Sequence, residues 1–217
     1  MPYDELITAV IAGDAELAAE LTRAALDAGA DPEEILSAGL VPAIEVVGQQ
    51  FSIGEIYVPD MLVAARAMKF AIAILQPILA AAKHEPRGTV VIGTVKGDVH
   101  DVGKNIVAIM LEGSGFDVCD LGVDVAAATF VEAVTERRPD ILALSALLTT
   151  TMPVMKDVID ALASAGVRER VRVMVGGAPV TPEFAREIGA DVYAPDAGAA
   201  GEAAGRLIAT GVATPED

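Results

Sequence analysis

The pattern of the chain changes at residues 83–88, and this change limits its possible folds more than any other feature. Before it, apolar residues recur with helical spacing only; after it, short apolar runs rich in β-branched residues alternate with helical segments. Apolar strands that are each followed by a helix are typical of a parallel sheet covered on both faces. The sequence therefore predicts a helical domain over 1–86 and an α/β domain over 87–217.

Four helices are expected in the first part, and aspartates mark two of their starts. Asp14 and Asp31 can each accept hydrogen bonds from the first N–H groups of a helix. Gly39 should break the third helix, and Pro77 should kink or end the fourth. Four short helices joined by tight loops predict a bundle. The expected helices cover 3–12, 14–28, 32–50 with a break that ends near Pro42, and a long stretch after Pro59.

Five strands are expected in the second part, each followed by a helix. Five parallel strands predict a flavodoxin-like (Rossmann-type) doubly wound domain, whose ligands bind at the carboxyl ends of the strands. The expected strands are 89–95, 116–120, 141–145, 171–175 and 191–193, and the expected helices are 102–112, 126–137, 155–165, one that starts at 181, and 198–209.

Charge and composition argue against several classes of protein. The chain has 32 acidic and 15 basic residues, and a formal net charge of −17 disfavours binding to nucleic acid. The one cysteine, Cys119, excludes an intramolecular disulfide and a cluster of several thiolates around a metal. Every stretch of eighteen residues contains a charge or a proline, and the start of the chain does not resemble a signal peptide. We therefore expect a cytoplasmic protein that does not enter a membrane.

The loop after the first expected strand is where chemistry should lie. Asp98 and His100 are two positions apart, so the carboxylate can bond one ring nitrogen and orient the imidazole, as around metal-binding histidines. Gly97 and Gly103 would let a bulky ligand approach. From the loop alone, anion binding at a helix N-terminus or a structural role is the simpler interpretation. One histidine without nearby cysteines cannot form a zinc site, but a metal held by a macrocycle needs only one protein ligand.

Three short motifs, in order along the chain, resemble the signature of B12-binding domains. They follow the first, third and fourth expected strands, and longer segments extend the match over nearly the whole chain. The chain resembles the cobalamin module of methionine synthase and the small corrinoid proteins of methanogen and acetogen methyltransferase systems. The matching segments are Asp98-x-His100-x-x-Gly103, Ser145-x-Leu147, Gly176-Gly177, residues 51–59 (FSIGEIYVP), Met68-Lys69 and residues 93–105 (GTVKGDVHDVGKN).

This resemblance implies a cofactor and its ligand. Cobalamin or a related cobamide, with methylcobalamin as the loaded form, would bind with its own lower base displaced and His100 on the cobalt (base-off/His-on). Asp98 matches the carboxylate partner of that histidine. Thr151 stands where a serine usually completes the relay, and threonine keeps the hydroxyl. A helix N-cap is the alternative role for one of the threonines at 149–151.

The resemblance also assigns further contacts with the cofactor. Phe51 and Val58 would cover the upper face of the corrin with an apolar cap, although helical periodicity alone favours an ordinary core position for each. The glycine pair Gly176-Gly177 would leave room for the displaced nucleotide tail, and a tight turn is the alternative. The residues assigned to the cofactor in the second domain, beside Asp98 and His100, are Gly103, Ser145, Leu147, Thr149, Gly176, Gly177, Tyr193 and Asp196.

The function implied by the resemblance is that of a methyl carrier, a non-autonomous corrinoid subunit of a methyltransferase system. Cobalt(I) would accept a methyl group through a donor-specific methyltransferase and pass it to an acceptor methyltransferase that uses tetrahydrofolate or a thiol. A reductive activation protein is the third expected partner. The donor is left open among methylamines, betaines, methanol and methoxylated aromatics.

Three alternatives share part of the pattern. The small subunit of an adenosylcobalamin mutase has the Asp-x-His-x-x-Gly motif but resembles the α/β half alone. A B12-sensing regulator needs a DNA-binding segment, for which this acidic chain has no helix-turn-helix or basic candidate. A flavodoxin-like domain without a corrin leaves Asp98, His100 and residues 51–59 unexplained.

Overall fold

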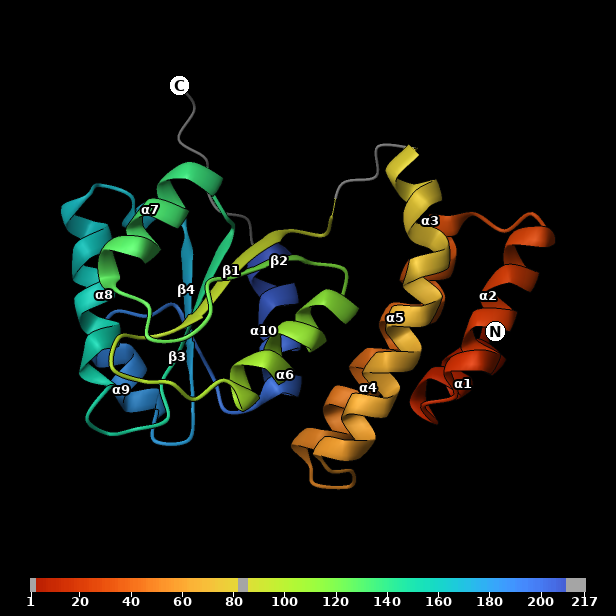
Figure 1. The fold of residues 1–217 in the computed structure, drawn as a ribbon, viewed down its shortest axis with the longest axis horizontal. Coiled ribbons are helices and arrows are strands. Elements are labelled where there is room, and N and C mark those ends of the chain that lie inside the picture. Colours follow the sequence, from red (N-terminus) through yellow and green to blue (C-terminus); the bar gives the residue numbers. More distant parts are fainter. Residues whose placement is uncertain (1–2, 82–85, 210–217) are drawn as a thin grey trace. The chain divides into compact units, whose positions relative to one another are not determined.

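The computed structural model describes residues 3–81 and 86–209, which form two compact units (Figure 1). The first comprises the described residues up to Pro86 together with Glu112–Gly115, and the second comprises the rest. Residues 83–85, at the expected change of pattern, lie outside the described residues.

The first unit is helical, and the two expected aspartate caps are confirmed. The carboxylate of Asp14 accepts a hydrogen bond from Leu17 N at 3.0 Å, and that of Asp31 accepts one from Glu33 N at 3.0 Å. The helix α5 packs against α1, α2 and α4. The elements are α1 (Asp4–Ile11), α2 (Ala15–Asp27), α3 (Pro32–Glu34), the π-helical η1 (Ile35–Leu40), α4 (Val41–Ser52) and α5 (Val58–Ala81).

The break expected between Gly39 and Pro42 is wrong, because α3, η1 and α4 follow one another without interruption. Proline has no N–H to donate, and the turn before Pro42 is π-helical, so the chain stays helical where one α-helical bond is missing. Gly39 has a packing role instead: a Cβ there would lie 3.2 Å from Leu6 and 3.3 Å from Tyr3.

Pro77 also fails to end its helix, since α5 continues to Ala81. A proline removes only one helical hydrogen bond, and this cost is outweighed where the helix is packed on its neighbours. By length and composition, α5 could cross a membrane over Val58–Leu79, but the core helix of a soluble protein passes the same test.

The second unit contains a five-stranded parallel sheet with the order β2-β1-β3-β4-β5. This order is that of flavodoxin-like doubly wound domains, so the expected fold class is confirmed. The strands are β1 (Thr89–Thr94), β2 (Asp117–Asp120), β3 (Ile141–Ser145), β4 (Arg172–Gly176) and β5 (Val192–Ala194), and the helices are α6 (Val102–Gly113), α7 (Ala127–Arg137), α8 (Pro153–Ser164), the 3-10 helix η2 (Arg168–Arg170), α9 (Pro182–Glu187) and α10 (Ala197–Ala209).

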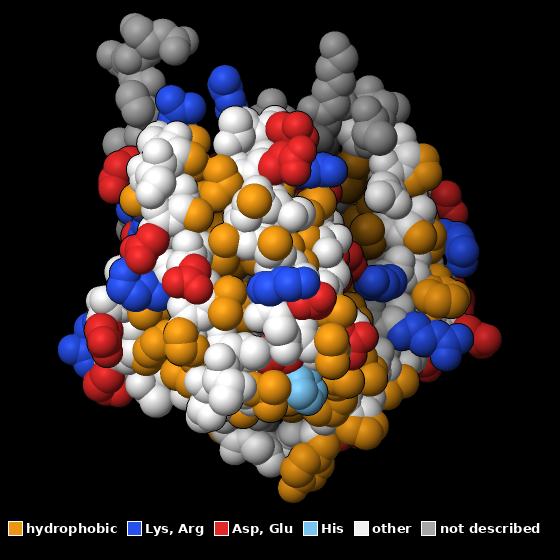
Figure 2. Space-filling model, turned by 60° about the vertical axis from the view of Figure 1, so that its left-hand side comes forward, with side chains coloured by type: hydrophobic (Ala, Val, Ile, Leu, Met, Phe, Trp, Pro, Cys, Tyr) orange, Lys and Arg blue, Asp and Glu red, His pale blue; other side chains and the backbone are white. Residues whose placement is uncertain are grey.

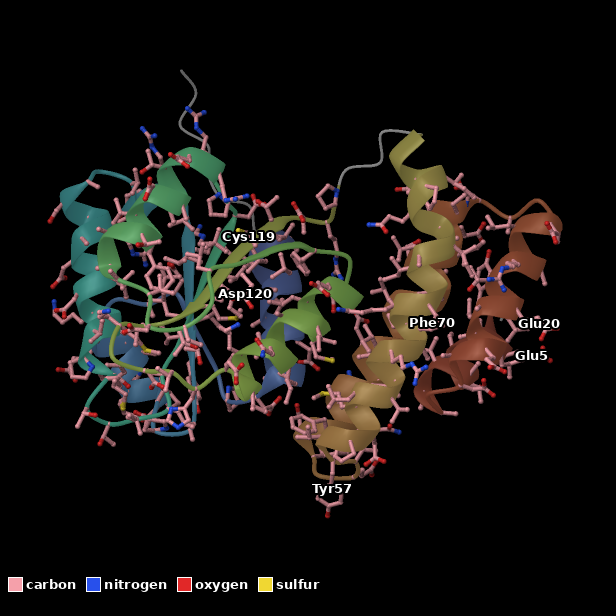
Figure 3. All side chains as sticks on the ribbon, in the orientation of Figure 1. Glu5, Glu20, Tyr57, Phe70, Cys119 and Asp120 are labelled. Atoms are coloured by element: carbon pink, nitrogen blue, oxygen red, sulfur yellow. The ribbon has the colours of Figure 1, made fainter. Side chains whose placement is uncertain are left out.

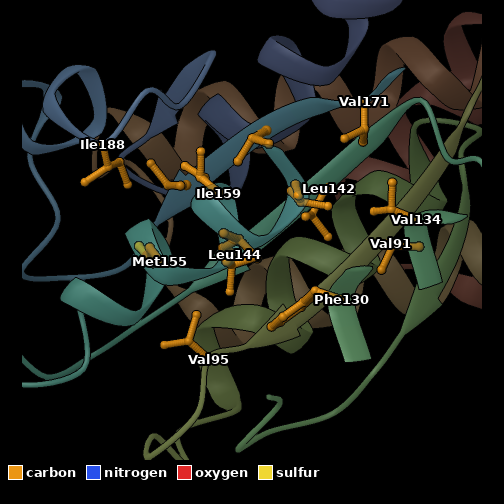
Figure 4. Packing of buried hydrophobic residues seen from close by; sticks show 14 of the residues in the cluster. Val91, Val95, Phe130, Val134, Leu142, Leu144, Met155, Ile159, Val171 and Ile188 are labelled. Atoms are coloured by element: carbon orange, nitrogen blue, oxygen red, sulfur yellow. The ribbon is translucent and has the colours of Figure 1, made fainter. Parts of the chain in front are cut away.

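Both faces of the sheet are covered, because alternate residues of each central strand point to opposite sides. On one face, Val90 and Ile92 of β1 pack with residues of α6 and α10. On the other face, Val91 packs with residues of α7, α8 and α9, and this cluster includes Phe130 and Leu142 (Figure 4). The core therefore fixes the central strands, and the loops at their carboxyl ends are built on a rigid base.

Candidate cofactor site

The loops that follow β1 and β3 lie next to each other, because these two strands are paired in the sheet. Thr94, the last residue of β1, is in register with Ser145, the last residue of β3. The β1–α6 loop carries Asp98 and His100, and the β3–α8 loop carries Thr151. Strand β1 lies between β2 and β3, so the chain forms β2 on one side of β1 and then β3 on the other. The carboxyl end of β1 is therefore the switch point, where ligands bind in such sheets.

The carboxylate of Asp98 joins the two loops. Its Oδ1 accepts a hydrogen bond from His100 N at 3.1 Å and lies 2.7 Å from His100 Nδ1. Its Oδ2 accepts hydrogen bonds from Leu147 N at 2.8 Å, from Leu148 N at 3.3 Å and from Thr151 Oγ1 at 2.7 Å. The side chain of Asp98 is fully buried, so these donors replace the water that it loses.

Asp98 is ionised in this environment. Burial by itself would raise the pKa of its carboxyl group, but hydrogen bonds from Leu147 N, the Thr151 hydroxyl and His100 outweigh burial and hold that pKa well below its usual range. An ionised carboxylate has no hydrogen to give, so Nδ1 of His100 must donate. The lone pair of the neutral imidazole is then on Nε2, and the side chain of His100 is 47% exposed.

The position of Thr151 decides between its two expected roles. Its hydroxyl lies 2.7 Å from Asp98 Oδ2 and 3.0 Å from the carbonyl oxygen of Leu148. The N-cap residue of α8 is Met152, and no side chain caps that helix. The helix N-cap alternative is therefore wrong for the threonines at 149–151. Thr149 is exposed to solvent.

Large apolar side chains stand exposed beside the imidazole of His100. Val99 is 71% exposed, Val102 68%, Leu147 43% and Leu148 41%. Figure 2, which colours histidine pale blue, shows an imidazole at the surface of the molecule. A half-exposed imidazole with apolar neighbours suits a large and largely apolar partner better than a hydrated ion.

The glycine pair at the end of β4 has a structural explanation. Gly177 has φ +128°, and a Cβ there would lie 1.9 Å from the carbonyl oxygen of Ala146. The N–H of Val180 donates to the carbonyl oxygen of Gly177 at 2.9 Å, so the expected alternative of a tight turn is present. Ser145 and Gly176 are paired in the sheet, which brings the second and third motifs together.

Three other residues that the resemblance assigns to the cofactor are described by their contacts and by the space around them. Tyr193 is partly buried against the hydrophobic cluster that contains Phe130. Asp196 accepts a hydrogen bond from Ala199 N at 2.9 Å at the start of α10. Gly103 has no atom within 4 Å of where a Cβ would be, so the space above it is open.

The assigned residues of the first unit lie at the end of α4 and the start of α5. Phe51 and Val58 are half-buried and so are not part of the buried core. Between them, Ile53 is 69% exposed and Tyr57 is 70% exposed, and Figure 3 shows Tyr57 extending away from the helices.

Two contacts near His100 were not predicted. The buried hydroxyl of Thr94 donates to the carbonyl oxygen of His100 at 2.9 Å. The ammonium group of Lys104, whose side chain is 1% exposed, is paired with the carboxylate of Asp120. Asp120 is the last residue of β2 and is labelled in Figure 3. Lys104 lies in the segment that carries the resemblance, but its partner becomes visible only when β1 and β2 are placed side by side.

Asp124, in the β2–α7 loop, is a third unexpected neighbour of the site. Its Oδ1 accepts a hydrogen bond from Gly97 N at 2.8 Å, and its Oδ2 accepts one from Lys96 Nζ at 2.9 Å. The hydrogen bond from Lys96 has the larger effect on Asp124 and that from Gly97 N the smaller, and both lower the pKa of its carboxyl group. No sequence signal marked this residue.

Family models identify both parts of the chain. Two models, each described as a B12 binding domain, match residues 88–204 and residues 3–76. The chain belongs to the B12-binding family. Trimethylamine corrinoid protein 2 of Methanosarcina mazei is 50% identical over 83% of this chain and 84% of that protein. A corrinoid protein of Desulfitobacterium hafniense is 43% identical over 94% of this chain and 96% of its own length.

Solved structures agree with this assignment. A cobalamin-binding protein from Desulfitobacterium hafniense has a TM-score of 0.81 and 32% identity, covering 93% of this corrinoid protein and 96% of that chain. A chain of the methanol:cobalamin methyltransferase complex of Methanosarcina barkeri has a TM-score of 0.82 and 33% identity, covering 96% of this chain and 80% of that one. The cofactor of the B12-binding protein described here is cobalamin or a related corrinoid.

A corrinoid fits the residues of the site. Among residues 3–81 and 86–209, no group of three or more His, Cys, Asp or Glu side chains could hold a metal ion. A corrinoid brings nitrogen ligands of its own for cobalt, so the protein would need to supply only one further nitrogen. The exposed imidazole of His100, held by Asp98, is a donor of that kind.

Proposed function

We propose that this corrinoid protein is a methyl carrier that serves separate methyltransferases, with His100 as the lower axial ligand of cobalt. The observation that carries the proposal is the buried, ionised Asp98, which holds His100 Nδ1 at 2.7 Å and leaves Nε2 as the ligand atom. When bound, the corrinoid supplies a cobalt atom that takes up a methyl group from a donor and gives it to an acceptor. The cofactor is cobalamin or a related cobamide in the base-off/His-on form.

The roles of the three relay residues follow from their contacts. His100 would hold cobalt through Nε2, and Asp98 orients the ring by accepting the hydrogen on Nδ1. Thr151 holds Asp98 through its hydroxyl, in the place of the serine expected from the family.

The two domains, 1–86 and 87–217, have different roles in the proposal. The second domain would hold the cofactor, and residues at the carboxyl ends of β3, β4 and β5 would line the slot for its nucleotide tail. In the first domain, Phe51 and Val58 are half-buried and apolar, and they would shield the corrin from water. The residues assigned to the tail slot are Ser145, Leu147, Gly176 and Gly177, with Tyr193 and Asp196 closing it; Gly103 and Thr149 are further residues assigned to the cofactor.

The carrier works with a donor-specific methyltransferase, an acceptor methyltransferase that uses tetrahydrofolate or a thiol, and a reductive activation protein, all in the cytoplasm. The first donor to test is a methylated amine, a class that includes methylamines and betaines. Relatives named as trimethylamine corrinoid proteins are 47–50% identical, and one named as a dimethylamine corrinoid protein is 44% identical. Methanol is the second donor to test, because the complex of Methanosarcina barkeri acts on it.

The test is reconstitution of the purified chain with cobalamin, followed by visible spectroscopy and by electron paramagnetic resonance of the cobalt(II) form. Wild type should show splitting from an axial nitrogen, and in cobalamin labelled with ¹⁵N in its lower base the splitting should remain that of ¹⁴N from the protein. His100→Ala should abolish it, whereas Asp101→Asn, a change at an exposed neighbour in the same loop, should not. A wild type that binds no corrin sinks the proposal, and a spectrum unchanged by His100→Ala removes His100 as the ligand.

A further inference from the structure

The backbone of Asp124 has a conformation that residues with side chains rarely adopt. Its φ is +56°, and among the described residues it shares a positive φ outside glycine only with Arg138. Aspartate and asparagine tolerate this region better than most residues because their short polar side chains can bond to nearby backbone. The conformation is disfavoured unless the surrounding contacts require it.

The contacts of Asp124 all lead to the segment that immediately precedes His100. Its N–H donates to the carbonyl oxygen of Asp98 at 2.9 Å, and its Oδ1 accepts from Gly97 N at 2.8 Å. Gly97 itself has φ +85°, so this part of the loop is tightly bent. The left-handed conformation of Asp124 thus accompanies two hydrogen bonds. Its backbone N–H bonds Asp98, and its side chain bonds the preceding residue, Gly97.

We infer that Asp124 is a positioning residue for the cofactor ligand, an inference that rests on the proposed role of His100. The β3–α8 loop holds the carboxylate of Asp98 through Leu147 N and Thr151 Oγ1. Asp124 holds the backbone of Asp98 from the opposite neighbour, the β2–α7 loop. With its backbone fixed from one side and its carboxylate from the other, Asp98 presents Oδ1 to His100 in one orientation, and the ring follows.

The negative charge of Asp124 is the lesser part of this role. Its ion pair with Lys96 is open to water, since the two side chains are 45% and 59% exposed, and exposed ion pairs contribute little. The hydrogen bond with Gly97 N needs only an acceptor oxygen. Asparagine has that oxygen and also tolerates a left-handed backbone, so it should replace aspartate at this position.

Arg138 provides a matched control. It has φ +48° at the C-terminal end of α7, where its N–H donates to the carbonyl oxygen of Val134. Such a conformation is a common way to end a helix, and glycine is favoured there. Arg138→Gly therefore makes the same backbone change as Asp124→Gly within the same unit, without touching the contacts of Asp98.

The experiment compares Asp124→Asn, Asp124→Gly and Arg138→Gly with wild type in the full chain. Hydrogen exchange at the Gly97 amide is followed in the protein without cofactor, and cobalamin affinity and nitrogen splitting are measured after loading. Asp124→Asn and Arg138→Gly should stay within about twofold of wild type. Asp124→Gly should speed exchange at Gly97 and raise the Kd for cobalamin by about tenfold each, the size expected for one lost hydrogen bond with a charged acceptor. Its nitrogen splitting should weaken.

The outcomes separate this inference from the function on which it rests. Urea denaturation checks that each variant is folded, and Asp124→Gly relieves a disfavoured conformation, so a cofactor defect without a loss of stability supports positioning. If Asp124→Gly matches wild type in both exchange and affinity, the inference is overturned. If wild-type protein itself lacks nitrogen splitting, the proposed function fails, and exchange at Gly97 still decides whether Asp124 braces the loop.

Discussion

The hydroxyl of Thr151 lies 2.7 Å from the carboxylate of Asp98, although 53 positions of sequence separate the two residues. The contact exists because β1 and β3 are neighbours in the sheet and both loops leave from the same edge. Each residue is buried, so the hydrogen bond is shielded from water.

Thr151→Val should weaken cofactor binding while Thr151→Ser preserves it. Valine has nearly the shape of threonine but cannot donate to Asp98 Oδ2, and a hydrogen bond to a charged group is worth about 1.5–3 kcal/mol. We expect the Kd for cobalamin to rise by about tenfold or more in Thr151→Val. Equilibrium titration with cobalamin measures this change, and equal affinities for the serine and valine variants would contradict the relay.

The low pKa of Asp98 makes the stability of the cofactor-free protein depend on pH. Its pKa is lower in the folded state than the value of about 3.9 for an unfolded chain, so the unfolded state binds more protons as the pH falls. The contribution of Asp98 is therefore present above about pH 4 and is lost as the pH falls through the folded-state value. In urea denaturation, wild type should exceed Asp98→Asn in stability at pH 7, and the difference should shrink at pH 3. A constant difference would mean that Asp98 is not held as the ion.

Gly177→Ala should be far more damaging than Gly122→Ala. Both glycines have positive φ, but only at Gly177 would the new methyl group collide, at 1.9 Å from the carbonyl oxygen of Ala146. We expect Gly177→Ala to lower the free energy of unfolding by more than about 3 kcal/mol, against about 1 kcal/mol for the backbone strain in Gly122→Ala. Denaturation with urea, monitored by circular dichroism, gives both values. Similar losses would show that the close approach at Gly177 relaxes easily.

The ion pair between Lys104 and Asp120 should respond unequally to the loss of each partner. Lys104 has a side chain 1% exposed, whereas that of Asp120 is 38% exposed and can be hydrated when it stands alone. Asp120→Asn leaves a buried ammonium group without its counter-charge and should cost about 2 kcal/mol or more, while Lys104→Met should cost less. Unfolding free energies of the two variants at pH 7 test this order, and the reverse order would contradict it.

The sequence is informative about this protein where local rules and tertiary structure agree. Strand β3 has the expected bounds, 141–145, because it is an apolar run in the middle of the sheet. The contact between Asp98 and His100 could also be predicted from the sequence, because only one residue separates them. The family resemblance then supplied Thr151, which no local pattern marks.

The errors arise where packing overrides a local rule. Gly39 is a helix breaker by propensity, yet it lies in a continuous helical segment because neighbouring helices pack against that segment. Pro77, expected to kink or end its helix, does not end it. Asp124 could not be found from its own segment, because its importance depends on which loop lies opposite it. Backbone conformation and strand order are properties of the folded chain, and one sequence does not display them.

Leu147 and Leu148 hold Asp98 with their backbone N–H groups, while their side chains are 43% and 41% exposed. Any residue other than proline can supply such an N–H. The side chains at 147 and 148 can therefore be replaced, by mutation or in evolution, without loss of the hydrogen bonds that hold Asp98 and so orient His100. A designer who wishes to admit a differently shaped corrinoid has two adjustable positions there, next to backbone hydrogen bonds that need not change.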